Sequence, residues 1–193
     1  STLNGMPVYF INGDPIRANG SVYSLDSKLD AEKYTFFSLA ALALQSQINW
    51  QADVVHANDW HTALSVYGSL TKRWEEGAKH VAGVITLHNL PFMGPDISAI
   101  LEGYGIKLAQ TDLPDWARVM PLPLGLWASD AIVAVSPTYG SEILTHEYGC
   151  GLGEFLQIRR ETISGVLNGI DVASFNPADD TALGVNFDID SLE

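Results

Sequence analysis

The sequence predicts an α/β fold, a Rossmann-like parallel sheet with helices on both faces. Short runs rich in β-branched residues alternate along the chain with longer helical stretches, and this alternation is typical of β-α-β units. The runs are also continuously apolar, as expected for strands that are buried on both faces of a parallel sheet. Because crossovers between parallel strands are right-handed, such a chain winds into a doubly wound layer.

The first half of the chain predicts three strands and two helices. A strand is expected at 8–12, before a loop rich in Gly, Asn and Pro. Residues 30–48 are rich in Ala and Leu and apolar on most faces, so we expect a buried helix there. Residues 52–57 predict a strand, 62–77 a helix that ends at a glycine, and 81–87 the longest strand.

The second half predicts shorter elements. Two short helices are expected within a loop rich in Pro and Gly, at 95–105 and 121–129. The remaining elements are a strand at 131–135, a helix that begins at Ser136-Pro137, a short helix near 153–160 and a strand at 164–167. The tail beyond Pro177 is acidic and weakly patterned.

Length, charge and cysteine count limit the possible functions. The chain has 193 residues, about one domain by the usual size of roughly 100–200 residues. We assign 1–180 to that domain and 181–193 to the start of a linker or tail. The net charge of −13 argues against a nucleic-acid partner, whereas a neutral polysaccharide meets no such objection. A single cysteine, Cys150, excludes an internal disulfide framework, and no apolar run is long enough to span a membrane.

Polar residues follow four of the expected strands. In chain order they are Asn58, Asp59, Trp60 and His61, then His88 and Asn89, then Ser136, Thr138 and Tyr139, and finally Asn168, Gly169 and Asp171. Ligands of open parallel sheets bind beyond the carboxyl ends of the strands. The sequence therefore predicts a binding site at this edge of the sheet.

Structural roles compete with binding at three of these positions. Ser136 before Pro137 fits a helix N-cap, and Asn168-Gly169 is a common turn dipeptide. Asp59 fits an N-cap of the helix expected from residue 62. A Trp directly after Asp59 favours a functional loop instead.

Two further motifs are weak. His56 and His61 invite a metal interpretation, but their spacing crosses from a strand into a loop, and no cysteine cluster or second His pair supports them. We therefore expect no metal. The glycine-rich run at 149–153 follows a helix and not a strand, so it predicts a loop and not a dinucleotide site.

Five blocks of the sequence resemble those of bacterial-type glycogen synthases and plant starch synthases. Read in order, they are DVVHANDWHTAL, TLHNLPFMG, AIVAVSPTYGSEI, GLGEFLQIR and SGVLNGIDVASFNPADD. The resemblance is collinear from about Met6 to about Asp180. The order of the blocks is more specific than any one of them.

The resemblance implies part of the N-terminal, acceptor-side half of a GT-B glycosyltransferase, with the second domain absent. Such enzymes transfer glucose from ADP-glucose to the non-reducing end of an α-1,4-glucan with retention, without a metal or organic cofactor. The implied location is the bacterial cytoplasm or the plastid. The resemblance implies that Asp59 and His88 are catalytic. The implied substrate-binding residues are Asn58, Trp60, His61, Asn89, Phe92, Ser136, Thr138, Tyr139, Asn168, Gly169 and Asp171.

Three departures from the family pattern bear on function. The Lys-x-Gly-Gly-Leu loop that contacts the donor is missing, as are the Arg/Lys pair and the glutamate of the second domain. Phe92-Met93-Gly94 replaces the usual aromatic-Gln-Gly. We therefore expect the isolated chain to be inactive, to bind ADP-glucose weakly and to tend to self-associate. Two alternatives remain: a GT-B transferase that uses another sugar nucleotide, and a non-catalytic glucan-binding module.

Overall fold

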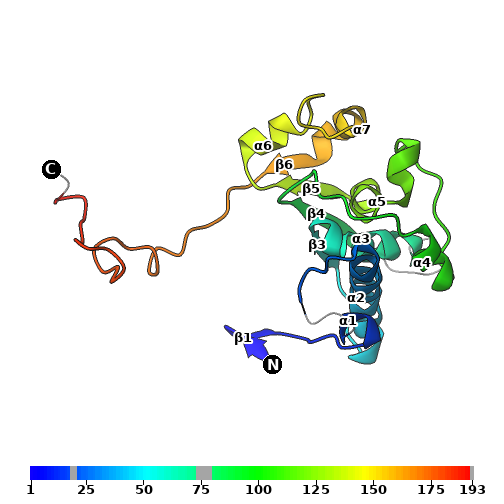
Figure 1. Cartoon of the computed structure of the whole chain (residues 1–193), viewed down its shortest axis with the longest axis horizontal. Helices are drawn as coiled ribbons and strands as arrows, with labels where there is room; N and C mark the ends of the chain where they lie inside the picture. The colour runs from blue at the N-terminus through cyan, green and yellow to red at the C-terminus, as the bar shows by residue number, and fades with distance from the viewer. Residues whose placement is uncertain (18–20, 73–79, 192–193) are drawn as a thin grey trace.

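A computed structural model describes residues 1–17, 21–72 and 80–191 of the chain. Its centre is a parallel sheet of four strands in the order β3-β4-β5-β6 (Figure 1). The strands are β3 (Val54–Asn58), β4 (Ala82–Leu87), β5 (Ala131–Ala134) and β6 (Ile163–Gly165). The expected α/β fold with a parallel sheet is confirmed.

The order of the strands in the sheet follows their order in the chain. A doubly wound sheet reverses direction once, so the strands of the described region lie on one side of such a reversal. The register brings Asn58 of β3 beside Thr86 of β4, and Leu87 of β4 beside Ala134 of β5. The carboxyl ends of these three strands therefore meet at one edge.

The core lies where α3 (Asp59–Lys72) and α5 (Pro121–Ala128) pack against each other and against the sheet. At Gly125, an added Cβ would come within 2.6 Å of the Ala63 side chain. The absence of a side chain at Gly125 therefore permits this close approach. The two short helices expected in the Pro/Gly-rich loop are confirmed as α4 (Ser98–Gly103) and α5.

Helix α2 (Ser27–Gln47) is confirmed, but its buried face is largely polar. Lys33 Nζ lies 3.0 Å from Asp30 Oδ1, and both side chains are buried. Asp30 also accepts the backbone N–H of Ser24, at 2.9 Å from Oδ2, and Lys33 donates to the carbonyls of Ser21 and Val22. Burial of this ion pair is compensated by hydrogen bonds that tie the preceding loop to the helix.

The remaining elements are short. They are α1 (Asp14–Arg17), η1 (Asp115–Val119), α6 (Pro137–Glu142), α7 (Gly153–Ile158) and η2 (Arg160–Thr162). The helix expected at Ser136-Pro137 and the one near 153–160 are thereby confirmed as α6 and α7. Within the part of the chain that the structure describes, no helix has the length and apolarity needed to cross a membrane.

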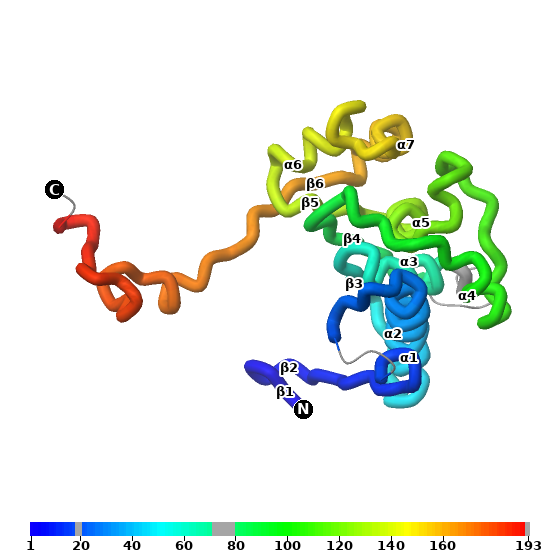
Figure 2. Tube along the Cα trace, in the orientation of Figure 1, coloured from blue at the N-terminus to red at the C-terminus, as the bar shows by residue number. Residues whose placement is uncertain are grey.

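The strand expected at 8–12 is wrong. A small hairpin of β1 (Thr2–Leu3) and β2 (Met6–Pro7) precedes this segment, which itself forms no strand. Figure 2 traces it from the hairpin to α1. The side chain of Phe10 is 83% exposed. Strand propensity depends on packing against a neighbouring strand, and this segment has none among the described residues.

Several boundaries differ from expectation by a few residues, including the start of α2 at Ser27 and that of β3 at Val54. The helix expected at 62–77 begins at Asp59, because the chain enters the helix directly from β3, and its expected end lies outside the described residues. The last strand ends at Gly165 and not at residue 167. Residues 166–191, here called the C-terminal arm, then run out from the sheet (Figure 1). Asn168-Gly169 lies in extended chain and not in a turn.

Candidate functional site

The carboxyl ends of β3, β4 and β5, with the residues directly after them, form an edge that we call the rim. Asp59 follows β3 without a loop, and its backbone has φ +50°. This left-handed conformation is unfavourable for most L-residues, by roughly 1–2 kcal/mol, and Asp and Asn tolerate it best. It turns the Asp59 side chain toward β4. The carboxylate Oδ1 accepts the backbone N–H of His88 at 2.8 Å and that of Asn89 at 3.3 Å.

The N-cap role considered for Asp59 is therefore wrong, because its carboxylate bonds across the sheet. The start of α3 is stabilised by Thr62 instead. Thr62 Oγ1 accepts the N–H of Asn58 at 2.6 Å and donates to the Asn58 carbonyl at 2.9 Å. The Asp59 carboxylate therefore bonds to the backbone after β4 and lies at the rim, where a ligand can reach it.

His88 is exposed at the rim beside Asn58. Its Nε2 lies 3.0 Å from Oδ1 of Asn58, on the neighbouring strand. With the amide oxygen as acceptor, the imidazole donates from Nε2, and its Nδ1 lone pair stays free to accept a hydrogen bond. Asp59 holds the backbone of His88, and Asn58 orients its ring.

Tyr139 reaches the same loop from the other side. Its hydroxyl accepts the backbone N–H of Leu90 at 2.8 Å. Ser136 is the N-cap of α6, as expected, and its Oγ accepts the N–H of Tyr139 at 2.9 Å. Burial raises the pKa of Tyr139, and the bond from Leu90 opposes that shift. Three successive N–H groups, at residues 88, 89 and 90, thus donate to side chains that follow the two flanking strands, Asp59 after β3 and Tyr139 after β5.

Trp60 and His61 turn away from the rim and pack against α2. Trp60 is 9% exposed, and its ring centroid lies 4.3 Å from that of His61. Tyr34 contacts both rings edge-on, at 4.9 Å from Trp60 and 4.7 Å from His61. Burial lowers the pKa of His61, with Asp59 opposing the shift. The expected ligand contacts of Trp60 and His61 stay predictions. This packing places Trp60 in the core and leaves His61 half-buried beside it.

The other predicted site residues divide into two groups. Phe92 is 63% exposed beyond β4, and Asn89 and Thr138 are also exposed at the rim. Asn168, Gly169 and Asp171 lie in the C-terminal arm. Asp171 bonds only locally in the described chain, with the N–H groups of Ala173 and Ser174 and with the Ser174 hydroxyl. The structure therefore brings the residues after β3, β4 and β5 together and leaves those after β6 apart.

His56 belongs to a different part of the fold. Its Nε2 lies 2.7 Å from Oγ1 of Thr86, on the neighbouring strand β4, so His56 and His61 do not converge. Within residues 1–17, 21–72 and 80–191, no group of three or more His, Cys, Asp or Glu is arranged to hold a metal ion.

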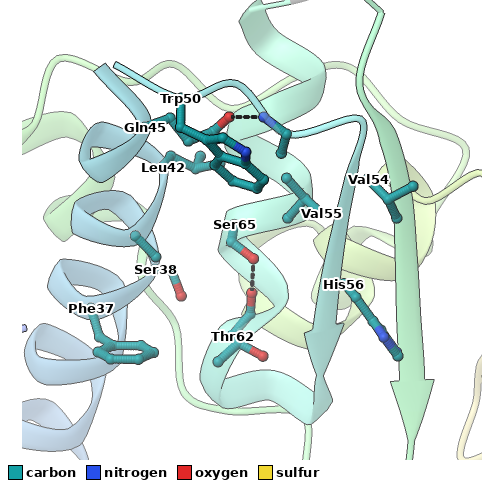
Figure 3. Close-up of a pocket in the computed structure, with 12 residues that line it drawn as sticks. Phe37, Ser38, Leu42, Gln45, Trp50, Val54, Val55, His56, Thr62 and Ser65 are labelled. Atoms are coloured by element: carbon teal, nitrogen blue, oxygen red, sulfur yellow. Dashed lines mark hydrogen bonds between the residues drawn. The ribbon is translucent and has the colours of Figure 1, made fainter. Parts of the chain in front are cut away.

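A pocket of about 250 Å³ opens between α2, β3 and α3. Figure 3 shows Leu42 and Gln45 of α2, Val55 of β3 and Ser65 of α3 around it, with Trp50 at one end. Local sequence patterns do not predict this pocket, because it depends on how α2 and α3 pack beside β3. Trp50 is 58% exposed.

Chemically, the rim combines a carboxylate, an imidazole and an exposed aromatic ring. Asp59 and His88 can bond to sugar hydroxyl groups, and the face of Phe92 can stack on a pyranose ring. The rim residues named above include no Lys or Arg. The rim therefore suits a neutral polyhydroxylated ligand better than a diphosphate.

Comparisons with known proteins agree with this chemistry. The family described as the starch synthase catalytic domain matches residues 1–158. The chain is 34% identical to a glycogen synthase of Streptococcus sanguinis over 201 residues, which cover 98% of this chain and 40% of that protein. It is 31% identical to a glycogen synthase of Streptococcus pneumoniae over 197 residues, which cover 100% of this chain and 41% of that protein.

A solved structure extends the likeness to three dimensions. The catalytic domain of starch synthase IV from Arabidopsis thaliana, bound to ADP and acarbose, matches with a TM-score of 0.75 and 30% identity. The match covers 100% of this chain and 41% of that one. The chain thus spans about 40% of the length of the relatives it matches.

Proposed function

This chain belongs to the starch synthase catalytic domain family, and from that premise we propose that it is the acceptor-side part of a GT-B glycosyltransferase. The reaction proposed is transfer of glucose from ADP-glucose to the non-reducing end of an α-1,4-glucan with retention. The observation that supports it most directly is the bond from the His88 N–H to Asp59 Oδ1 at 2.8 Å. It joins the two proposed catalytic residues at the ligand-binding edge of the sheet.

The proposed roles follow from the chemistry of the rim. Asp59 orients an acceptor hydroxyl and stabilises positive charge that develops at the anomeric carbon of the transferred glucose. His88 donates or accepts a hydrogen bond with that glucose. Phe92 stacks on a glucose unit of the acceptor. No step in this proposal requires a metal or an organic cofactor.

The donor side of the proposal rests on the relatives. The starch synthase IV structure contains ADP, which favours an adenine-nucleotide sugar as donor. We assign residues 1–180 to the acceptor-side domain, with 181–193 as the start of a linker, and we infer that the groups that hold the diphosphate belong to a second domain. The proposed location is the bacterial cytoplasm or a plastid. Self-association of the chain is also proposed, because no described strand pairs with the outer edge of β3.

The test is a transfer assay on a full-length protein that contains this chain. Radiolabelled ADP-glucose and UDP-glucose are each incubated with glycogen, and label in the ethanol-insoluble glucan is counted. The proposal expects incorporation from ADP-glucose. Faster incorporation from UDP-glucose would establish the alternative of another sugar nucleotide. No incorporation from either donor, together with glycogen binding, would leave a non-catalytic glucan-binding module.

A binding experiment on the 193-residue chain addresses the acceptor side separately. Maltoheptaose should bind with a Kd in the millimolar range or tighter, and Phe92→Ala should weaken binding by about tenfold because it removes one stacking surface. Phe10→Ala is the control, since Phe10 is also an exposed phenylalanine but lies far along the chain from the rim. Equal affinity for wild type and Phe92→Ala would exclude Phe92 from the acceptor site.

A further inference from the structure

We propose that Tyr139 is a positioning residue, whose hydroxyl holds the loop after β4 so that His88 and Asp59 face the same ligand. The catalytic consequence of this inference rests on the function proposed above. Its structural content, a phenol that fixes the backbone next to a rim histidine, does not. The sequence predicts that Tyr139 binds substrate, and the structure adds a bond from the Leu90 N–H to its hydroxyl.

The bond from Leu90 to Tyr139 spans two neighbouring strand ends. Leu90 is 0% exposed and belongs to the core, so its N–H group has little access to water. The Tyr139 hydroxyl at 2.8 Å provides the hydrogen-bond acceptor that this N–H needs. An unpaired buried N–H is unfavourable, and the loop would have to move to reach another acceptor.

The Tyr139 ring is itself held in place. Ser136 caps the helix that carries it, through the bond to the N–H of Tyr139. Gly140, the next residue, packs under β6, where an added Cβ would lie 3.8 Å from the Cα of Gly165. The ring is half-buried and packs against the hydrophobic core. Its hydroxyl therefore occupies a position set by β5, β6 and the start of α6.

Tyr139 and Asp59 act on the loop from opposite sides. Asp59, after β3, accepts the N–H groups of His88 and Asn89, and Tyr139, after β5, accepts that of Leu90. Because β4 lies between β3 and β5, the loop after β4 is held by residues that follow both neighbouring strands. Catalytic groups must be held to about 0.5 Å for full effect, and a clamp on three successive amides gives the backbone of His88 that restraint.

The test variant is Tyr139→Phe, which keeps the ring and removes only the oxygen. Tyr148→Phe is the matched control, because Tyr148 is 51% exposed and lies outside the rim. In NMR spectra of the 193-residue chain, Tyr139→Phe should speed hydrogen exchange at the Leu90 amide by about tenfold. It should also shift or broaden the His88 ring signals, while core amides keep their wild-type exchange rates. Unchanged Leu90 exchange and His88 signals would overturn the proposal.

The second measurement is kinetic and uses the full-length protein. Tyr139→Phe should lower kcat by about tenfold and leave both KM values within twofold, at a temperature where the variant is fully folded. A purely structural role would lower Tm without changing kcat below the transition, and that result would also overturn the proposal. A wild-type protein without transferase activity would refute the proposed function alone, since the NMR measurement would still decide whether Tyr139 positions the loop.

Discussion

An aspartate follows β3 and another follows β6, yet their carboxylates have different hydrogen-bond partners. The carboxylate of Asp59, after β3, bonds to the backbone of His88 and Asn89 on the next strand. The carboxylate of Asp171, after β6, bonds to the residues two and three positions further along its own chain. Bonding within the loop lowers the pKa of Asp171, with the Ser174 hydroxyl as the main cause. The first aspartate links two strands, and the second only shapes a local turn.

The difference shows that the neighbours of a strand decide what the polar residue after it can do. β4 lies between two strands, so its following loop receives side chains from both sides. Among the described strands β6 pairs only with β5, and the chain after it leaves the sheet as the C-terminal arm. A carboxylate at the rim is therefore fixed before a ligand arrives, whereas one in the arm is not.

The largest expected effect is on turnover at Asp59. In the full-length protein, Asp59→Asn should reduce kcat by about 100-fold or more while the KM for glucan changes by less than threefold. Asn can still accept the His88 N–H, and it tolerates the left-handed backbone. Only the negative charge is lost, so Tm should stay within a few degrees of wild type. Turnover near the wild-type value would reduce Asp59 to a structural link between β3 and β4.

A pair of glycines tests the boundary between the sheet and the arm. A Cβ at Gly165 would lie 2.3 Å from the backbone of Pro137, whereas one at Gly169 would meet no atom within 4 Å. Gly165→Ala should therefore lower the free energy of unfolding by about 3 kcal/mol, and Gly169→Ala should change it by less than about 0.5 kcal/mol. Urea denaturation of both variants measures the difference. Equal effects would mean that the arm packs in solution as the sheet does.

The pH dependence of stability should report on His61. Burial lowers its pKa in the folded protein, so the unfolded chain binds the proton first as pH falls. The contribution of His61 is complete above the unfolded pKa of about 6.5 and is lost as pH falls toward the folded value. His61→Phe should flatten the fall in Tm between pH 7 and pH 5, because a ring without a titrating group fills the same space. His61 Nε2 has no hydrogen-bond partner in the described chain, which makes Phe an acceptable replacement.

The control for that measurement is the exposed His146. His146→Phe should leave the slope of Tm against pH as in wild type. If His61→Phe and wild type lose stability in parallel as pH falls, another group causes the acid sensitivity.

The smallest effect is expected at Asp171. Asp171→Ala should leave the urea midpoint of unfolding close to the wild-type value, since its bonds are local and exposed. Binding of maltoheptaose to the 193-residue chain should also be unchanged. Calorimetric titration and urea denaturation check both statements. A loss of affinity would show that the arm folds back over the rim when glucan binds.

Most of the parallel sheet could be predicted from the sequence, because runs such as 81–87 are apolar throughout and bounded by clear loop residues. The location of Asp59 and His88 at the rim followed from the same pattern. Their bond did not, since it depends on the register of β3 against β4 and on the left-handed backbone of Asp59. The strand expected at 8–12 was wrong because a strand needs a partner, and local sequence does not show whether one is present.

Buried polar contacts were the other part that the sequence could not show. Asp30 and Lys33 stand in a helix that looked apolar, and only the fold reveals that they turn inward and bind the preceding loop. Tyr139 was predicted to bind substrate, which stays a prediction, and nothing in the sequence indicated that its hydroxyl accepts the N–H of Leu90. The bond between Leu90 and Tyr139 joins residues 49 positions apart in the chain, so periodicity along the sequence carries no signal for it.

The agreement between strand order and chain order has a consequence for how the protein folds. β4, β5 and β6 each pair with the strand synthesised just before them, so none of these three strands has to wait for a later one. Folding can therefore proceed stepwise from β3 as the chain leaves the ribosome. Pairing each new strand with one that has already been made shortens the exposure of unpaired strand edges. The bond from Leu90 to Tyr139 forms only when β5 and α6 have docked. The rim is therefore completed late in folding.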